Sequence, residues 1–340
     1  MSKTKSTSRM IISRTPVRIS LFGGGTDYPA FYERHSGIVL GTTINKYTYV
    51  SVNTLSEFFE HNIRIGYSKT ELVKKPEEIV HPSIRECLIH KNISGNLDIH
   101  IFSDLPAKTG LGSSSSFTVG FLNALYAIEG TKTSKQQLAL EACHVEQKLI
   151  KENVGSQDQF HAAYGGLNVI EFNPNHINVR PVIISLEKLQ LLENSLIIFY
   201  TGLTRFASDV VKEQIDKTKT KSNDTYLLQM RDMVKTAEDI ISTSSEDDMI
   251  KDLGLLLDES WQLKKQLSSK ISNSKIDESY SKAKKAGAYG GKLCGAGSGG
   301  FLAILAPDNK KSEIRENLKN LLEVDFKFEN QGSTIIYMKD

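Results

Sequence analysis

Apolar and polar residues alternate at residues 97–103, which predicts a β-strand with one apolar face. Residues 117–127 carry large apolar side chains at helical spacing, and this pattern stops at Gly130. Between them lies the segment 105–116, LPAKTGLGSSSS. The free N–H groups and the dipole at a helix start attract anions, and glycine lets a phosphate approach closely. The segment is therefore predicted to bind phosphate; the alternative, a flexible serine-rich linker, is disfavoured between two such clear elements.

The same reasoning predicts further elements along the chain. Strand-like patterns occur at residues 11–12, 17–22, 44–52, 167–172, 195–200, 301–305 and 333–338. Helical spacing and helix-start signals occur at residues 29–35, 76–90 and 134–152, repeatedly between 207 and 280, and from residue 312. Glycine-rich stretches predict loops at residues 23–27 and 290–300, and residues 154–166 form a polar segment flanked by glycines, for which helix and loop are both open. The change from mixed elements to mainly helical ones predicts a domain boundary near residue 190.

The composition narrows the class of protein. The 340 residues include 42 basic and 40 acidic side chains, a formal net charge of +2, which gives no electrostatic reason for binding nucleic acid or a membrane surface. Three cysteines without CxxC spacing argue against a disulfide framework and a zinc site. Residues 1–9 are polar and basic, so we expect a disordered extension rather than a secretory signal. With no apolar run of membrane-spanning length, we expect a soluble cytoplasmic protein.

A second glycine-rich segment, residues 295–300, has the sequence GAGSGG and formally matches GxGxxG. A dinucleotide-binding fingerprint opens a helix after a strand, whereas this segment precedes a predicted strand, so its context excludes that function. The chain also lacks GxxxxGK[ST], which disfavours a Walker-type NTPase. These glycines instead predict a backbone that passes close to another loop or to a ligand.

Two carboxylates are candidates for chemistry. Glu146 lies within the predicted helix 134–152, and Asp158 lies in the polar sequence GSQDQ at residues 155–159. A single glutamate on a helix is more often a surface charge than a functional group. For Asp158 a functional and a structural role are equally open. Spacing alone therefore assigns neither residue.

Three motifs together resemble the GHMP family of small-molecule kinases, which includes galactokinase, homoserine kinase, mevalonate kinase and phosphomevalonate kinase. They occur in the family's order at residues 16–28 (PVRISLFGGGTDY), 106–116 (PAKTGLGSSSS) and 292–301 (KLCGAGSGGF). The second motif is the most specific, and the similarity spans about residues 10–338. Gly24 and Gly25 replace the Glu-His of galactokinases. This GGGTD form resembles the branch that acts on D-glycero-D-manno-heptose 7-phosphate, and it also resembles fucokinases.

The resemblance implies a role for each matching residue. ATP would be bound by Pro106, Lys108, Gly110, Leu111, Gly112, Ser113, Ser114, Ser115 and Ser116. The sugar would be bound by Gly24, Gly25, Thr26, Asp27, Arg205 and Gly297. Magnesium would be bound by Ser114, with Ser115 as an additional hydroxyl, and by Glu146. Asp158 would act as the base or orienting carboxylate for the sugar hydroxyl, and the charge of Arg18 would offset that of the γ-phosphate.

The resemblance also implies an α/β fold of two domains, residues 10–190 for ATP and residues 191–340, with the active site in the cleft between them. The implied activity is ATP- and Mg²⁺-dependent phosphorylation of the anomeric hydroxyl of D-glycero-D-manno-heptose 7-phosphate to the 1,7-bisphosphate. This product would enter nucleotide-activated heptose synthesis for bacterial surface polysaccharide. Arg205 and Arg14 are candidates for binding the substrate's phosphate, and a structural role for both is equally open.

Two alternatives to this function stay open. One is a kinase for another sugar, such as L-fucose or galactose. The other is a non-catalytic sugar or nucleotide sensor, which would be expected to lose Asp158, Glu146 or the serines, all of which are present. The expected partners are ATP and a small sugar phosphate, and a homo-oligomer is left open.

Overall fold

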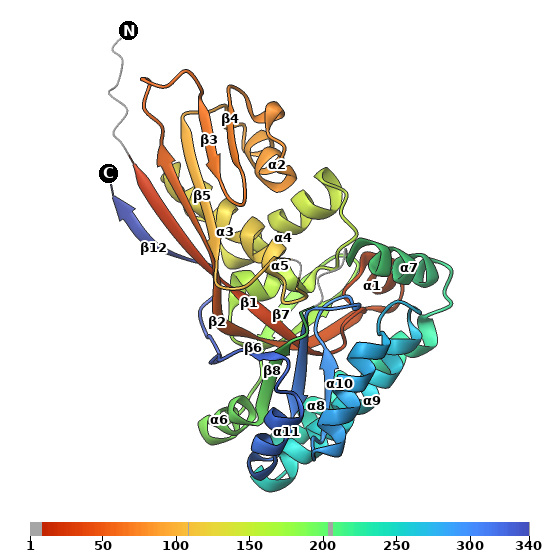
Figure 1. Ribbon diagram of the computed structural model, residues 1–340. Coiled ribbons are helices and arrows are strands. Elements are labelled where there is room, and N and C mark those ends of the chain that lie inside the picture. The colour runs from red at the N-terminus through yellow and green to blue at the C-terminus, as the bar shows by residue number, and fades with distance from the viewer. Residues whose placement is uncertain (1–8, 108, 203–206, 340) are drawn as a thin grey trace.

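The structure is a computed structural model that describes residues 9–107, 109–202 and 207–339 (Figure 1). Within these residues, eight strands form the larger sheet in the order β12-β1-β2-β5-β3-β4, and β6 and β7 extend it from the start of β2. The strands are β1 Met10–Phe22, β2 Gly37–Thr54, β3 Ile63–Gly66, β4 Thr70–Val73, β5 Leu97–Ser103, β6 Leu167–Phe172, β7 Ile177–Pro181 and β12 Thr334–Lys339.

Helices cover one face of the larger sheet (Figure 1). Val50 of β2 and Ile99 of β5 point into a core that also contains Phe121 and Phe160 from the helices. This burial of apolar strand and helix faces drives the packing of the layer. The helical elements here are η1 Pro76–Glu78, α2 Pro82–His90, α3 Ser113–Ile128, α4 Lys135–His144, the π-helix η2 Val145–Leu149 and α5 Gln157–Tyr164.

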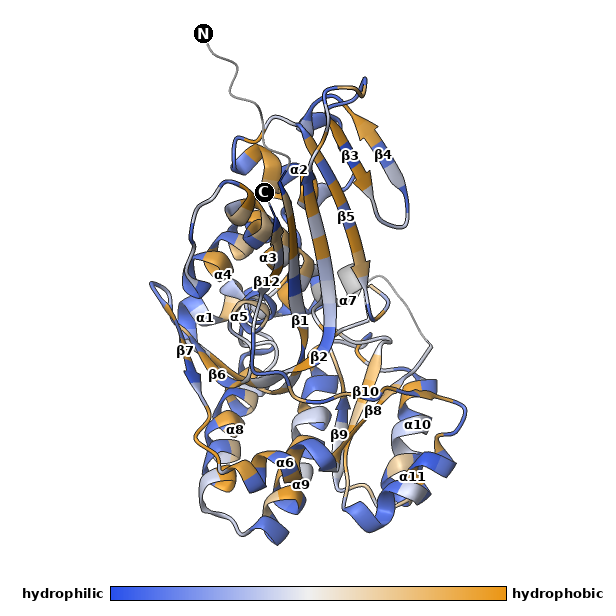
Figure 2. Cartoon of the chain, turned by 90° about the vertical axis from the view of Figure 1, so that its left-hand side faces the viewer, coloured by the Kyte–Doolittle hydropathy of each residue, from blue (hydrophilic) through white to orange (hydrophobic). Residues whose placement is uncertain are grey.

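The smaller sheet has the order β11-β8-β10-β9. Its strands are β8 Leu196–Tyr200, β9 Gly290–Leu293, β10 Phe301–Leu305 and β11 Leu322–Glu323. β10 is buried throughout and is visible as a hydrophobic stretch in Figure 2. Trp261 and Leu302 belong to the core between this sheet and its helices. The helices of this half are α6 Leu186–Ser195, α8 Asp224–Thr243, α9 Glu246–Gln266, α10 Ser274–Lys285, η3 Asp308–Lys310 and α11 Lys311–Asn317.

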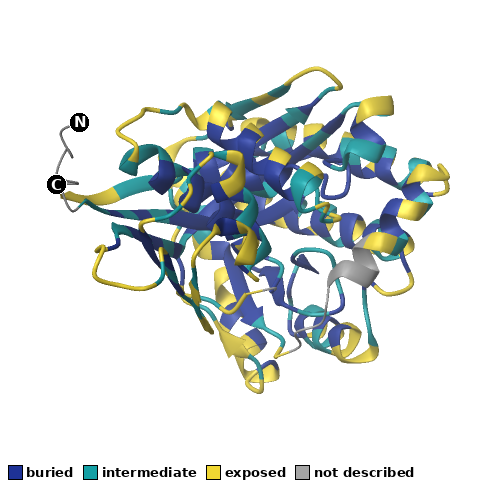
Figure 3. Cartoon of the chain, turned by 90° about the horizontal axis from the view of Figure 1, so that it is seen from above, coloured by how far each residue is buried: buried dark blue, intermediate teal, exposed yellow. Residues whose placement is uncertain are grey.

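A shared core joins the two sheets. Ile19 of β1 belongs to the same buried cluster as Ile198 of β8, Met249 of α9 and Phe301 of β10. Buried residues fill the centre of the molecule, and exposed residues concentrate in the outer loops and helix faces (Figure 3). Two further helices, α1 Pro29–His35 and α7 Ala207–Lys219, pack against each other beside this core. The molecule therefore has the mixed α/β architecture that the sequence predicts, and its strands form two sheets.

The first and last strands of the described chain pair with each other. The last strand, β12, pairs antiparallel with the first half of β1, so Met10 lies opposite Lys339 and the first and last strands are neighbours at one edge of the larger sheet (Figure 1). The division of the chain near residue 190 stays a prediction. The expected disorder of residues 1–9 falls almost entirely outside the described residues, and Arg9 donates a hydrogen bond to the carbonyl of Ile128 at 3.0 Å.

Most predicted elements are confirmed, and three differ. The strands expected at residues 97–103, 167–172 and 301–305 match β5, β6 and β10. The prediction of one helix over residues 76–90 is wrong because Pro82 begins a separate helix, α2. The polar segment 154–166 contains α5, and the loop predicted at 290–300 begins with β9. The helix expected at 134–152 starts at the Ser134 cap, whose side chain accepts from the Gln137 N–H at 3.0 Å, and ends in the π-helix η2.

Candidate active site

Three glycine-rich segments meet around a cavity of about 460 Å³. Elements of both sheets contribute to it: β1 and the loop that follows it, the start of α3, the approach to α5, and residues of α7, α9 and the loop after β9. The wall residues are Arg18, Ser20, Gly24, Gly25, Asp27, Tyr28, Gly110, Gly112, Ser113, Ser114, Lys151, Glu152, Asn153, Val154, Gly155, Gln157, Asp158, Gln214, Lys264, Gly295 and Ala296.

The phosphate loop, residues 105–116, reaches this cavity at the start of α3. Gly110 and Gly112 have left-handed backbones, with φ of +87° and +76°, and Gly112 is the N-cap of α3. A side chain at Gly110 would collide with the carbonyl of Cys294, so the phosphate loop packs backbone to backbone on the third glycine segment. The exposed start of α3 therefore presents backbone N–H donors and the positive end of the helix dipole to the cavity.

The four consecutive serines of this loop divide into two pairs. Ser113 and Ser114 line the cavity. Ser115 is buried and its hydroxyl donates to Glu146 at 2.8 Å. Ser116 is also buried, and its hydroxyl donates to the carbonyl of Pro16 at 2.7 Å, which fixes α3 to β1. The first pair is thus available to a ligand, while the second holds the loop in place.

Arg18 and Asp158 form a charged pair on the cavity wall. Two guanidinium nitrogens of Arg18 contact the same Asp158 oxygen, Oδ1, at 2.9 and 2.7 Å. A third nitrogen donates to the carbonyl of Gly110 at 2.7 Å, which ties the pair to the phosphate loop. Among the described residues Oδ2 of Asp158 has no hydrogen-bond partner, and it lies beside Gly112. The pair therefore holds one carboxylate oxygen and leaves the other facing the phosphate loop.

Asp27 connects the first glycine segment to α5. Its carboxylate accepts hydrogen bonds from the backbone N–H of Gly25 at 2.9 Å and of Gln157 at 3.3 Å. Burial raises the pKa of this carboxyl, because a charged form is less stable away from water. Thr26 is fully buried, and its hydroxyl donates to the carbonyls of Gly23 and Ile38. Asp27 thus lines the cavity, whereas Thr26 holds the turn that presents it.

Glu146 is buried in the π-helix behind the phosphate loop. Its Oε2 accepts hydrogen bonds from Ser115 at 2.8 Å and from Gln159 at 2.5 Å, while its Oε1 has no partner among the described residues. Burial raises the pKa of Glu146 to about 7. The described residues contain no cluster of three or more His, Cys, Asp or Glu that could hold a metal. Glu146 is not part of the described cavity wall, but its unsatisfied oxygen, with the hydroxyl of Ser115 on the same carboxylate, fits magnesium, which takes hard oxygen ligands and obtains others from phosphates and water.

Sequence reasoning missed three charged wall residues, Lys151, Glu152 and Lys264, of which Lys264 of α9 is the buried one. Its ammonium donates a hydrogen bond to the carbonyl of Gly295 in the third glycine segment. The signal was present in the spacing, because Met249, Leu253, Leu257 and Trp261 form an apolar stripe and Lys264 follows it by three residues. A lysine on the buried face of a helix is unusual and could have been singled out.

The other predicted site residues lie elsewhere. Lys108 and Arg205 fall outside the described residues. Leu111 belongs to the shared core, Pro106 is exposed, and Gly297 packs on Ile271, so none of these is part of the described cavity wall. Arg14 lies over the ring of Tyr47, 4.5 Å from its centre, and is also absent from that wall. Ligand contacts for these residues stay predictions.

Comparison with known proteins assigns this arrangement to a family. The family model for the GHMP kinases N terminal domain matches residues 78–166, and that for the GHMP kinases C terminal matches residues 247–324. A curated D-glycero-alpha-D-manno-heptose 7-phosphate kinase from Campylobacter jejuni is 28% identical, over 95% of this chain and 98% of that protein. The likeness therefore extends over both halves of the chain and includes all three glycine-rich segments.

Solved structures show the same fold. A D-glycero-D-manno-heptose 1-phosphate kinase from Bacteroides thetaiotaomicron superposes with a TM-score of 0.73 at 22% identity, covering 98% of this chain and 100% of that one. A putative sugar kinase from Campylobacter jejuni superposes with a TM-score of 0.69 at 26% identity, covering 96% and 98%. No helix among the described residues is both long and apolar enough to cross a membrane.

Proposed function

Because the chain belongs to the GHMP kinase family of ATP-dependent phosphotransferases, we propose that it phosphorylates the anomeric hydroxyl of D-glycero-D-manno-heptose 7-phosphate, giving the 1,7-bisphosphate. The substrate is supported by the likeness to the curated heptose 7-phosphate kinase, which runs along nearly the full length of both proteins. The sequence GGGTD at residues 23–27 agrees with that branch. The product would enter the synthesis of nucleotide-activated heptose.

The observation that carries the reaction type is the pair of Arg18 and Asp158. In phosphoryl transfer the protein acts mainly by positioning the reactants and stabilising charge. The free Oδ2 of Asp158 accepts the proton of the attacking sugar hydroxyl, while Arg18 holds Oδ1 and contacts the phosphate loop at Gly110. The carboxylate and the phosphate loop are therefore fixed relative to each other by one guanidinium.

The phosphate loop supplies the remaining charge stabilisation. Backbone N–H groups at the start of α3, together with Ser113 and Ser114, would bind the phosphates of ATP. Ser114 and Glu146, with Ser115 as an additional hydroxyl, would hold magnesium, whose charge would offset that of the phosphate oxygens. Burial of Ser115 and Ser116 keeps this loop in one conformation, so its donors are positioned before the substrates bind.

The test is a coupled assay of ADP release with ATP, Mg²⁺ and D-glycero-D-manno-heptose 7-phosphate. We expect kcat/KM of about 10⁴ M⁻¹ s⁻¹ or more, within the ordinary range of enzymes. Phosphorus NMR of the product should show a phosphate at the anomeric position. If L-fucose or galactose were turned over efficiently and the heptose phosphate were not, the substrate proposal would be wrong and the kinase class would stand.

A further inference from the structure

Lys264 is a buried lysine on the cavity wall that the scheme above does not use. The residue is only 6% exposed, and its ammonium donates to the carbonyl of Gly295. Among the described residues no carboxylate forms an ion pair with it within 4 Å. An ammonium carries three N–H donors, and a buried charge needs compensation from a counter-charge or several hydrogen bonds. The described residues therefore compensate the charge and the N–H donors of Lys264 only in part.

The charges around Lys264 come from several elements. Asp27 and Asp158 attract its ammonium, Arg18 and Lys292 repel it, and the thiol of Cys294 lies nearby. The carboxylates have other partners, because Asp158 is paired with Arg18 and Asp27 accepts two backbone N–H groups.

Lys292 is a second buried lysine of this neighbourhood. Its ammonium donates to the carbonyl of Leu21 at 2.9 Å, and it too lacks an ion pair with a carboxylate among the described residues. Arg18 and Lys264 thus lie near two carboxylates that already have partners, and burial lowers the pKa of Lys292 well below its usual value. The ammonium of Lys264, whose one hydrogen-bond partner among the described residues is a carbonyl, therefore favours an anion in the adjoining cavity.

The position of Lys264 is fixed by its surroundings. Trp261, one turn earlier on α9, is completely buried in the core, which holds the helix in place. Gly295, whose carbonyl accepts from Lys264, packs directly against Gly110 of the phosphate loop. The ammonium therefore lies beside the place where the third glycine segment meets the phosphate loop, on the wall that also carries Asp158.

We propose that Lys264 binds a phosphoryl group in this cavity. The proposal rests on the kinase function above, since two phosphoryl groups would enter the cavity in that reaction: the γ-phosphoryl group of ATP and the phosphate of the sugar. Both offer the same chemistry, oxygen atoms with negative charge that accept N–H donors and neutralise an ammonium. Lys264 would act beside Arg18 as a second fixed cation.

Binding experiments on variants test this proposal and separate the two sources. The variants are Lys264→Met and Lys264→Arg, and the matched control is Lys265→Met, because Lys265 is the next residue and pairs with Asp277 at 3.6 Å away from the cavity wall. Calorimetry would measure the affinity for ADP, for the imido analogue of ATP, for heptose 7-phosphate and for the unphosphorylated heptose. Thermal unfolding would confirm that each variant is folded.

A contact with the γ-phosphoryl group predicts that Lys264→Met weakens binding of the imido analogue about tenfold or more and leaves ADP binding unchanged. A contact with the sugar's phosphate predicts the same loss for heptose 7-phosphate and none for the unphosphorylated heptose. Lys264→Arg should retain most of the affinity, and Lys265→Met should match the parent. Equal affinities of the parent and Lys264→Met for all four ligands would overturn the proposal. A parent that binds these ligands but does not phosphorylate the heptose phosphate would refute only the proposed substrate.

Proton uptake gives a second readout that does not depend on the methionine variant. Burial lowers the pKa of Lys264 to about 8. A bound phosphoryl group favours the charged form, so binding at pH 8.5 should take up protons, measured by calorimetry in buffers of different ionisation enthalpy. Lys264→Arg, whose guanidinium stays charged, should bind without this uptake. Uptake that is the same in the parent and in Lys264→Arg would contradict the assignment to Lys264.

Discussion

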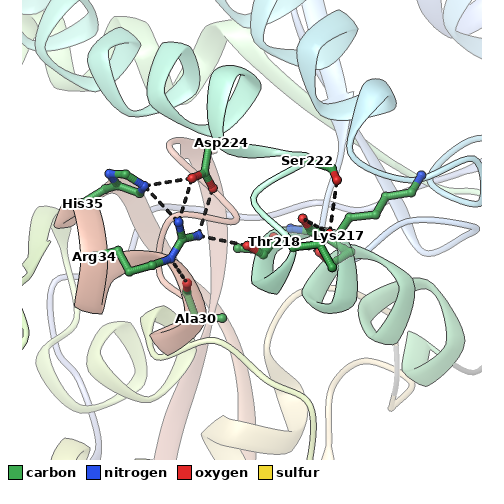
Figure 4. Close-up of polar contacts among 9 residues, drawn as sticks. Ala30, Arg34, His35, Lys217, Thr218, Ser222 and Asp224 are labelled. Atoms are coloured by element: carbon green, nitrogen blue, oxygen red, sulfur yellow. Dashed lines mark hydrogen bonds and ion pairs between the residues drawn. The ribbon is translucent and has the colours of Figure 1, made fainter.

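Two of the arginine–aspartate ion pairs among the described residues are chemically alike and differ in their surroundings. Arg18 and Asp158 meet at 2.7 Å on the cavity wall, where their side chains are 6% and 25% exposed. Arg34 of α1 and Asp224 of α8 also meet at 2.7 Å, with side chains 28% and 17% exposed (Figure 4). Distance alone therefore does not distinguish a functional pair from a structural one.

The second pair uses its donors to hold helices together. Both terminal nitrogens of Arg34 donate hydrogen bonds to the carboxylate of Asp224, which His35 also contacts (Figure 4). The guanidinium also donates to the backbone carbonyls of Thr218 and Ala30. Both oxygens of Asp224 are thus occupied. In the first pair one oxygen of Asp158 remains free and faces the phosphate loop. The two pairs therefore differ in whether the carboxylate keeps an oxygen that can accept a hydrogen bond from a ligand.

The largest difference in activity is expected between the variants Asp158→Asn and Asp224→Asn. An amide cannot accept the proton of the attacking hydroxyl, so Asp158→Asn should lower kcat by about a hundredfold or more, within the range of general-base effects. Asp224→Asn changes the same atoms in the other pair and should leave kcat within about twofold of the parent. The measurement is ADP release at saturating ATP and sugar phosphate, after thermal unfolding has shown that both variants are folded. Near-normal turnover by Asp158→Asn would remove it from the catalytic role.

The site was predictable from the sequence where the chain itself carries the signal. The phosphate loop was found because glycines and serines lie between a clear strand and a clear helix, and those elements match β5 and α3. Contacts between distant segments were not predictable in this way. The packing of Gly110 on the third glycine segment depends on how the two sheets join, and the glycines by themselves predicted only a close approach to another loop or to a ligand.

The residues that sequence reasoning placed poorly depend on tertiary burial. Helix α5 is short and its first turn is polar, so the sequence shows no clear apolar stripe. Its buried face is defined by the packing of Phe160 in the core. The apolar stripe of α9 puts Lys264 on the buried face of the helix, but its contact with the Gly295 carbonyl follows only from how α9 packs on the third glycine segment. The serine that contacts Glu146 is Ser115, because the π-helix and the start of α3 set which hydroxyl points inward. Each of these outcomes needs the three-dimensional neighbour, which a single sequence does not contain.

Glu146 differs from both aspartates because it is a buried carboxylate with no cation beside it among the described residues. Its pKa is raised by burial from 4.5 to about 7, so ionisation destabilises the folded protein increasingly as pH rises from 4.5 through 7. Glu146→Gln removes this ionisation. Without metal, we expect the variant to have a higher Tm than the parent at pH 8, by about 2 °C or more, and no such advantage below pH 4.5.

Glu146→Gln should also bind magnesium more weakly than the parent. The concentration of Mg²⁺ needed for half-maximal ADP release should rise about tenfold or more, a smaller effect than that of Asp158→Asn because serine hydroxyls and phosphates remain as ligands. In the parent this requirement should also rise as pH falls below 7, since the protonated carboxyl is a poor ligand. A magnesium requirement that is equal in parent and variant at every pH would contradict the assignment of Glu146.

The smallest expected effect is on the pair that only holds helices together. Its ion pair is partly exposed, so Asp224→Asn should lower the free energy of unfolding at pH 7 by only about 0.5–1 kcal/mol. The Arg34 guanidinium holds the pKa of Asp224 below its usual 3.8, with His35 adding to the effect. The stabilisation is therefore present above pH 3.8 and is lost as pH falls through the lowered pKa. Urea unfolding of the parent and the variant should differ at pH 7 and converge at acidic pH. A loss of several kcal/mol, or a fall in kcat, would mean that this contact between α1 and α8 also sets the shape of the cavity, and the two pairs would no longer be separate in function.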